Sequence, residues 1–232
     1  MNKLFAAAVI AAGFATTSDA AVLKLDSYTS SIQSVSVKSS PVANTPGTVG
    51  ATGFNLTDTT GDMGSFVGWC LDIAHYLMNK GSSQNYTPTN DPFSNSFGLT
   101  DVGRDRVQSV FDANYGRLDT SNGDQAAAFQ MALWEAAYED DNTALSVSSG
   151  LFKASSTGST NLANRYLMAA SAYSGDMVWN LSFLEVDGDA DRGRYTGQNL
   201  VSVSPVPVPA AGLLLVTGLF GMGAITRRRR KA

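Results

Sequence analysis

Cysteine and histidine are almost absent from this chain: its 232 residues include one of each, Cys70 and His75. A single cysteine excludes a disulfide within the chain. One cysteine and one histidine are also a thin basis for a metal site. The sequence further lacks a phosphate-binding glycine loop, a nucleotide-binding motif and a basic patch for nucleic acid. We therefore predict no cofactor, no metal and no nucleic-acid partner.

The composition is that of a folded, acidic domain. Hydrophobic residues make up 44% of the chain, which is enough for a core and argues against wholesale disorder. The formal net charge is -4. Without the charged residues of the two terminal segments described next, 10 basic residues face 19 acidic ones, a net charge of -9. Such a domain should repel nucleic acid and anionic lipid.

The first 20 residues contain the parts of a secretory signal peptide in the usual order. Lys3 is the positive charge, Leu4 to Phe14 is the apolar segment, and the small-residue cleavage site "SDA" ends at Ala20. The order of these features predicts export and cleavage after Ala20. The alternative is a buried first helix, which would not need a positive charge before the apolar segment or small residues after it.

The C-terminal stretch "SPVPVPAAGLLLVTGLFGMGAITRRRRKA" predicts a single membrane span. It carries no charge over the 20 residues from Val206 to Ile225, which is long enough to cross a bilayer once as a transmembrane helix. The basic block behind it should stay on the cytoplasmic side. The prolines in front of it favour an extended polyproline segment just outside the span.

This tail resembles the VPxPA-CTERM (VPLPA-CTERM) form of the PEP-CTERM sorting signals. The proline motif and the basic anchor are formed by Val206, Pro207, Val208, Pro209 and Ala210, and by Arg227, Arg228, Arg229 and Arg230. The resemblance implies an exosortase, a membrane-embedded cysteine protease of Gram-negative bacteria, as a partner. It also implies anchoring in the inner membrane before processing, and then release or attachment at the cell surface. The expected domains are a signal peptide (1–20), an exported domain (21–204) and a sorting tail (205–232).

The exported domain follows the order strands, helices, strands. Apolar patterning predicts strands over residues 23–40, 51–58, 65–73, 177–188 and 194–204. Helical spacing predicts helices over residues 101–115, 123–140 and 159–174. Residues 40–50 and 80–100 are expected to be loops, and Asp124 is the expected N-cap of the second helix. The expected fold class is α+β: a mostly antiparallel β-structure with a helical insertion of about three helices, plus the signal helix and the transmembrane helix.

The one cysteine lies at an expected strand end, in "FVGWCLDI", and has three plain interpretations: an inert core residue, a disulfide between two chains, or a leftover without a role. About 60 residues later, "FQMALW" places Gln130 and Trp134 on one face of the alanine-rich helix. A glutamine on an apolar face is unusual, because a buried amide must find partners or lose free energy. One solution is chemical: the Cys70 thiolate attacks the Gln130 carboxamide, ammonia leaves, and an internal thioester remains.

The two segments resemble the thioester domains of bacterial surface adhesins, loosely over residues 60–185. The family has an aromatic-Cys-apolar-Asp segment and a later Thr-Gln-x-Ala-Ile-Trp segment. The matching residues are Trp69, Cys70, Leu71 and Asp72 in the first segment, and Gln130, Ala132, Leu133 and Trp134 in the second. Phe129 departs from the pattern, since the family usually has Thr there, and the substitution removes a hydroxyl beside the reacting amide.

The resemblance implies a role for each matched residue. Cys70 and Gln130 would form the thioester, and the surrounding shell would be Trp69, Asp72, Phe129 and Trp134, with the aromatic residues excluding water and Asp72 orienting the backbone. The implied function is covalent attachment at the cell surface or in the extracellular matrix, to an amine-bearing surface partner or to an exopolysaccharide. Because this acyl transfer happens once per molecule, the chain is not expected to be an enzyme.

Three other functions are open but less favoured by the sequence. His75 follows Cys70 by five residues, but a cysteine protease would also need an oxyanion hole and an orienting partner, and the sequence reveals neither. A hydrolase of extracellular polymers would need a pair of acids, and none stands out. Asp187, Asp189 and Asp191 alternate as in calcium loops, but Gln198 stands where an EF-hand loop has Glu.

Overall fold

The computed structural model describes residues 20–42, 47–61, 63–73, 75–90, 93, 98–187 and 197–206. The predicted signal helix, and the predicted transmembrane helix beyond Val206, lie outside these residues. Within the described ranges, no helix is long and apolar enough to cross a membrane. The described helices and strands lie between Ala21 and Pro205.

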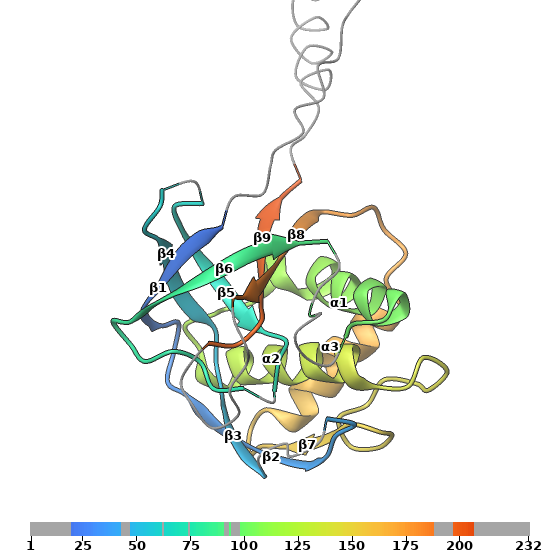
Figure 1. Ribbon diagram of the computed structural model, residues 1–232. Helices are drawn as coiled ribbons and strands as arrows, with labels where there is room; N and C mark the ends of the chain where they lie inside the picture. The colour runs from blue at the N-terminus through green and yellow to red at the C-terminus, as the bar shows by residue number, and fades with distance from the viewer. Residues whose placement is uncertain are drawn as a thin grey trace, which may run out of the picture.

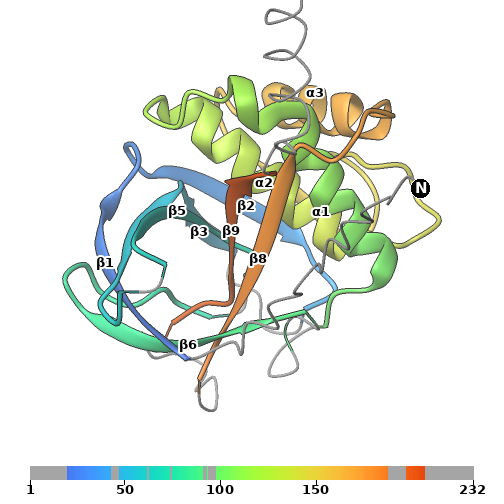
Figure 2. The same cartoon turned by 90° about the horizontal axis from the view of Figure 1, so that it is seen from above.

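Six antiparallel strands close into a barrel in the order β1, β4, β5, β9, β8, β6 (Figures 1 and 2). Their bounds are β1 Ala21–Tyr28, β4 Phe54–Asp58, β5 Ser65–Cys70, β6 Ser83–Thr89, β8 Trp179–Val186 and β9 Leu200–Pro205. The barrel is filled by apolar side chains, among them the fully buried Leu23, Leu25, Leu56 and Leu200. Closure leaves these six strands with no free edge to pair with another chain.

Three helices are inserted between β6 and β8, and they gather on one side of the barrel (Figure 2). They are α1 Asp101–Asn114, α2 Gly123–Tyr138 and α3 Thr160–Ser171, with a short 3-10 turn, η1 Tyr115–Arg117, after α1. A separate sheet has the order β3 Thr48–Ala51, β2 Gln33–Ser39, β7 Lys153–Ser155. The central helix α2 is buried at every residue from Ala126 to Tyr138, so it forms the middle of the core.

The described part of the chain confirms an α+β fold with antiparallel strands around a helical insertion. The expected loops were wrong in part. Residues 80–100 contain β6, whose polar sequence hides its strand character because only Tyr86 is buried. Residues 40–50 contain most of β3, and β7 was not expected at all. The N-cap of α2 is Asn122, whose side chain accepts a hydrogen bond from Gln125 N, rather than Asp124, which lies in the first turn.

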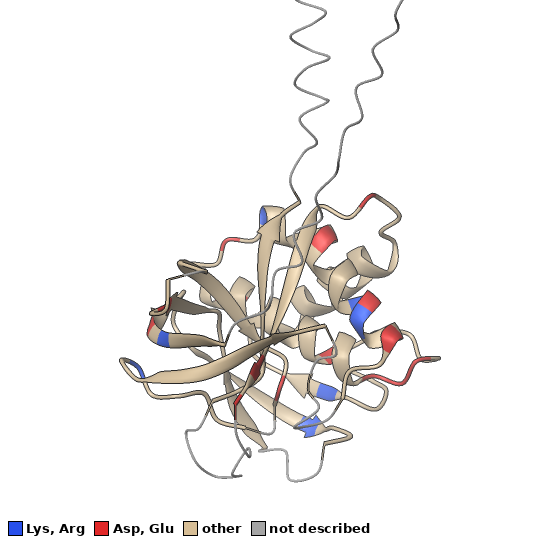
Figure 3. Cartoon of the chain, turned by 45° about the horizontal axis from the view of Figure 1, so that its top comes forward, with Lys and Arg blue, Asp and Glu red and all other residues tan. Residues whose placement is uncertain are grey.

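Acidic positions lie on both the barrel and the helical side rather than in one patch (Figure 3). Within the described residues, no group of three or more His, Cys, Asp and Glu side chains could hold a metal ion. Asp189 and Asp191 lie outside those residues.

Candidate functional site

The carboxamide of Gln130 is held against the backbone of Cys70. The amide of Cys70 donates to Gln130 Oε1 at 3.0 Å, and Gln130 Nε2 donates to the Cys70 carbonyl at 2.6 Å. Both residues are 1% exposed. The two residues that the sequence pairs across 60 positions are thus in direct contact in the core.

This contact exists because the β4–β5 ladder stops before Cys70. β4 begins at Phe54, which lies opposite Gly68, so no β4 residue pairs with Cys70. On its other side β5 continues to pair with β9, where Cys70 lies opposite Leu200. The free backbone N–H and C=O of Cys70 need partners in the core, and the Gln130 side chain supplies both.

The pairing corrects one premise of the sequence argument. From the sequence, a buried Gln130 was unusual, and a chemical bond was one way to avoid the cost of an amide without partners. Its amide does have partners, both on the backbone of Cys70. Burial of Gln130 is therefore explained by hydrogen bonding, and any case for a bond between Cys70 and Gln130 must rest on how the thiol and the carboxamide are placed.

The Cys70 thiol is protonated in this environment. Its Sγ donates to the carbonyl oxygen of Asp72 at 3.0 Å. Burial raises the pKa of Cys70 strongly, the charge of Asp72 raises it further, and the indole of Trp134 acts in the opposite direction. The thiol is thus held in its neutral form, and among the described residues Gln130 is the carboxamide that hydrogen-bonds the Cys70 backbone.

The loop after Cys70 is fixed by three buried side chains. Tyr138 Oη donates to the Leu71 carbonyl at 2.6 Å and accepts from Ile73 N at 3.1 Å. The carboxylate of Asp72 hydrogen-bonds His75 Nδ1. These contacts hold the Asp72 carbonyl, which receives the thiol, in a defined position.

Gln198, which lies just before β9, ties the same loop from the other side. Its Nε2 donates to the carbonyls of Asp72 and His75. His75 is 7% exposed and Asp72 is 2% exposed, so the pair is enclosed together with the thiol. The structure therefore places His75 beside Asp72 in this buried loop.

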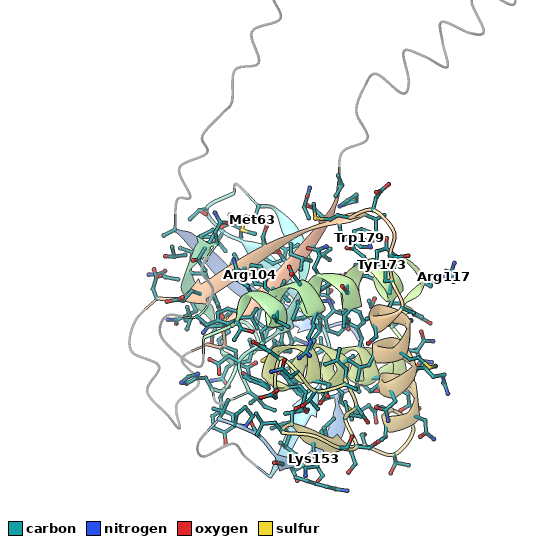
Figure 4. All side chains as sticks on the ribbon, turned by 90° about the vertical axis from the view of Figure 1, so that its right-hand side faces the viewer. Met63, Arg104, Arg117, Lys153, Tyr173 and Trp179 are labelled. Atoms are coloured by element: carbon teal, nitrogen blue, oxygen red, sulfur yellow. The ribbon has the colours of Figure 1, made fainter. Side chains whose placement is uncertain are left out.

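An aromatic cluster covers the opposite face of β5 from the Cys70 side chain. Trp69 follows the strand alternation and packs against Phe129, with ring centroids 4.8 Å apart. The cluster consists of Trp69, Phe111, Tyr115, Phe129, Tyr166 and Trp179. Trp179, labelled in Figure 4, is half-buried, as are Tyr115 and Tyr166. Phe129, the departure from the thioester-domain pattern, is thus an internal member of this cluster.

Trp134 lies on the same helix face as Gln130, one turn further along α2, and is 2% exposed. Its indole Nε1 is buried and makes no hydrogen bond within the described part of the chain. The phenolic oxygen of Tyr86, inside the barrel, is also buried and unpaired among the described residues. Burial and the nearby Cys70 raise the pKa of Tyr86.

The structure gathers the predicted site residues around one strand end, but in two groups. Gln130, Asp72 and Trp134 surround Cys70, whereas Trp69 and Phe129 face the aromatic cluster. Of the sorting motif only Val206 is described, and Pro207 to Ala210 and the basic anchor Arg227 to Arg230 lie outside the described residues.

Two contributors to the site were missed from the sequence. Tyr138 continues the spacing of Gln130 and Trp134, at four residues per step along α2, so its place on that face was readable. Gln198 had no such signal, because it comes from a distant loop and its contacts are to backbone carbonyls.

Three solved structures resemble this chain in a comparison of folds. The N-terminal domain of the Streptococcus pyogenes pilus tip adhesin Cpa has 14% identity and a TM-score of 0.40, with 79% of this chain and 99% of that chain covered. The N-terminal thioester domain of a surface protein from Clostridium perfringens has 12% identity and a TM-score of 0.43, covering 76% and 100%. The Bacillus anthracis TIE protein has 10% identity and a TM-score of 0.38, covering 82% and 40%.

No protein-family model matches the sequence, and no curated protein does either. Two of the three similar structures are domains of bacterial surface proteins, and one of these is a thioester domain, the class that the two motifs resemble. At these identities and TM-scores the likeness carries no argument about activity, so the function rests on Cys70, Gln130 and their surroundings.

Proposed function

We propose that Cys70 and Gln130 form an internal thioester, and that the exported protein uses this bond to attach covalently at the cell surface or in the extracellular matrix. The observation that carries the proposal is the double hydrogen bond between the Gln130 carboxamide and the Cys70 backbone. It fixes the Gln130 carboxamide against the backbone of the residue that carries the thiol, with both residues closed off from water. Such fixed placement of two reacting groups is a large part of what an intramolecular acyl transfer needs.

Formation of the bond would use groups already in place. Cys70 Sγ attacks Gln130 Cδ, the C–N bond breaks, and the nitrogen leaves as ammonia with the thiol proton. During the attack negative charge builds on Oε1, which already accepts the Cys70 N–H at 3.0 Å. That N–H is therefore positioned to stabilise the oxyanion without reorganisation.

In attachment, a nucleophile from the partner breaks the thioester. A partner amine or hydroxyl attacks the Gln130 carbonyl carbon, the C–S bond breaks, and the sulfur takes up the proton that the nucleophile loses. The product is an amide or ester at Gln130 and a free thiol at Cys70. The net charge of -9 in the exported segment favours approach of cationic groups such as a lysine side chain. Each chain reacts once, so we propose a binding protein rather than an enzyme.

The two terminal segments would direct the protein to the cell surface or the extracellular matrix. We propose export through the signal peptide over residues 1–20, anchoring in the inner membrane by the apolar tail, and processing by an exosortase at the motif from Val206 to Ala210. Replacement of Pro207 and Pro209 by alanine should leave the protein in the inner-membrane fraction. Normal release or surface display of that variant would contradict the sorting proposal without bearing on the thioester.

The thioester is tested by a fluorescent primary amine added to the purified protein. The wild type should become covalently labelled at Gln130, and a free thiol should appear at Cys70. The variants Cys70→Ala and Gln130→Ala should take no label, while Gln125→Ala, in the first turn of the same helix, should be labelled like the wild type.

The competing role is structural: the Gln130 side chain supplies the hydrogen-bond partners that the Cys70 backbone lacks at the end of β5, and Cys70 is an inert core residue. In that case neither the wild type nor any variant takes label. A protein of this kind would be a non-covalent component of the envelope or matrix.

A further inference from the structure

We infer that the indole N–H of Trp134 is held unpaired so that it can donate to the sulfur of Cys70 when that sulfur becomes negatively charged. The inference deepens the proposed thioester function and rests on it for its role in attachment. In attachment, the Trp134 N–H would stabilise the negative charge on the leaving thiolate and so would affect how fast the thioester opens.

The position of Trp134 follows from the helix that carries Gln130. The two residues are one turn apart on the same face of α2, and Gln130 is bound to the backbone of Cys70. Trp134 is 2% exposed, and its Nε1 makes no hydrogen bond among the described residues. A buried donor without an acceptor costs free energy, and indole nitrogen can only donate. An unpaired N–H in this place therefore needs a reason.

The neutral thiol does not use this donor, but a thiolate would. In the neutral thiol, Sγ donates its hydrogen bond to the Asp72 carbonyl oxygen at 3.0 Å. Burial and the Asp72 charge both oppose a negative sulfur, whereas Trp134 lowers the pKa of Cys70 and so favours it. Trp134 is thus a side chain whose contact with the sulfur strengthens as charge develops.

The charge appears in a defined step. When an amine nitrogen attacks Gln130 Cδ, the Cδ–Sγ bond breaks and the electron pair of that bond remains on Sγ. The Trp134 N–H donates to this sulfur until the proton released by the amine reaches it. The same contact would stabilise the attacking sulfur during formation of the thioester.

The neighbouring Trp69 provides a matched comparison. Its indole Nε1 is equally buried and also unpaired within the described residues. Its side chain, however, leaves β5 on the opposite face from Cys70, and its ring lies 6.4 Å from that of Tyr115. The substitutions Trp69→Phe and Trp134→Phe thus remove the same N–H and similar volume, but only one of them on the sulfur side.

The experiment measures two rates in the full chain for the wild type, Trp134→Phe and Trp69→Phe. The first is the rate of thioester opening by methylamine, followed by mass. The second is the rate of alkylation of Cys70 by iodoacetamide at one fixed pH, in protein whose thioester is opened or never formed. Loss of a hydrogen bond to a charged sulfur should slow both reactions about tenfold in Trp134→Phe. Trp69→Phe should differ less from the wild type than Trp134→Phe does.

If Trp134 has only a structural role, Trp134→Phe should raise the rates of both methylamine opening and alkylation. Loosened packing exposes a buried thiol or thioester, and both reagents then react faster. Rates in Trp134→Phe that equal or exceed those in Trp69→Phe would overturn the inference. A wild type that never loses ammonia would refute the thioester proposal instead, and the alkylation rates would still decide whether Trp134 stabilises the charged sulfur.

Discussion

Opening the thioester should lower the stability of the folded chain without any change in its sequence. The bond would join positions 60 residues apart, and a covalent link across such a span removes loop-closure entropy from the unfolded chain. The chain-entropy relation for cross-links gives about 4 kcal/mol of stability at 25 °C for a loop of this length. The folded state should change little, because the Gln130 carbonyl oxygen can accept the Cys70 N–H in both the thioester and the methylamide.

Urea unfolding followed by tryptophan fluorescence, before and after methylamine treatment, measures this difference. In thermal unfolding the same loss corresponds to a fall in the midpoint of roughly 8–16 °C. Gln130→Ala, which cannot form the bond, should give the same curve with and without methylamine. Coincident curves for treated and untreated wild type, once amine incorporation has been verified, would show that the link does not constrain the unfolded chain and would refute this reasoning.

Three further predictions concern the frame of the site. In a Cys70→Ala background, Gln130→Met leaves a buried N–H and C=O unpaired and should lower the free energy of unfolding by about 2–4 kcal/mol in urea titrations; Gln125→Met, which loses a bond at the exposed start of α2, should cost less than about 1 kcal/mol. Tyr138→Phe removes both contacts to the loop after Cys70 and should cost about 1–3 kcal/mol, with faster amide exchange at Ile73; unchanged protection there would contradict the assigned contact. Burial raises the pKa of Glu135 to about 8 from 4.5. Because the folded chain then holds a proton that the unfolded chain has lost, the unfolding free energy should fall as the pH rises from 4.5 to 8, and Glu135→Gln should flatten that slope.

The helical insertion was predictable because its signals are local. The spacing of apolar residues in α1 and α3 and the alanine-rich run in α2 each define a helix without any tertiary information. The closed barrel was not predictable from such signals. β6 has a polar sequence with one buried residue, Tyr86, and becomes a strand because β1 and β8 pair with it on both sides.

The candidate site, too, could be predicted from the sequence only in part. The sequence paired Cys70 with Gln130 through two short motifs, and in the structure their contact joins the Gln130 side chain to the Cys70 backbone. Its cause was not expected, because it depends on where β4 begins relative to β5. Trp69 and Trp134 looked alike in the sequence as water-excluding aromatics. Strand alternation puts the Trp69 side chain on the face of β5 opposite Cys70, whereas Trp134 lies on α2, one turn from Gln130.

The central claim is that Cys70 and Gln130 become covalently joined with loss of ammonia. The most direct test is the intact mass of the purified wild-type protein, measured beside Cys70→Ala and Gln130→Ala and compared with the calculated mass of each. The account predicts a wild type that is lighter than calculated by one ammonia, and two variants at their calculated masses. A wild type at its full calculated mass, with Cys70 reacting as an ordinary thiol only after unfolding, would contradict it and leave the pairing with Gln130 as a packing arrangement.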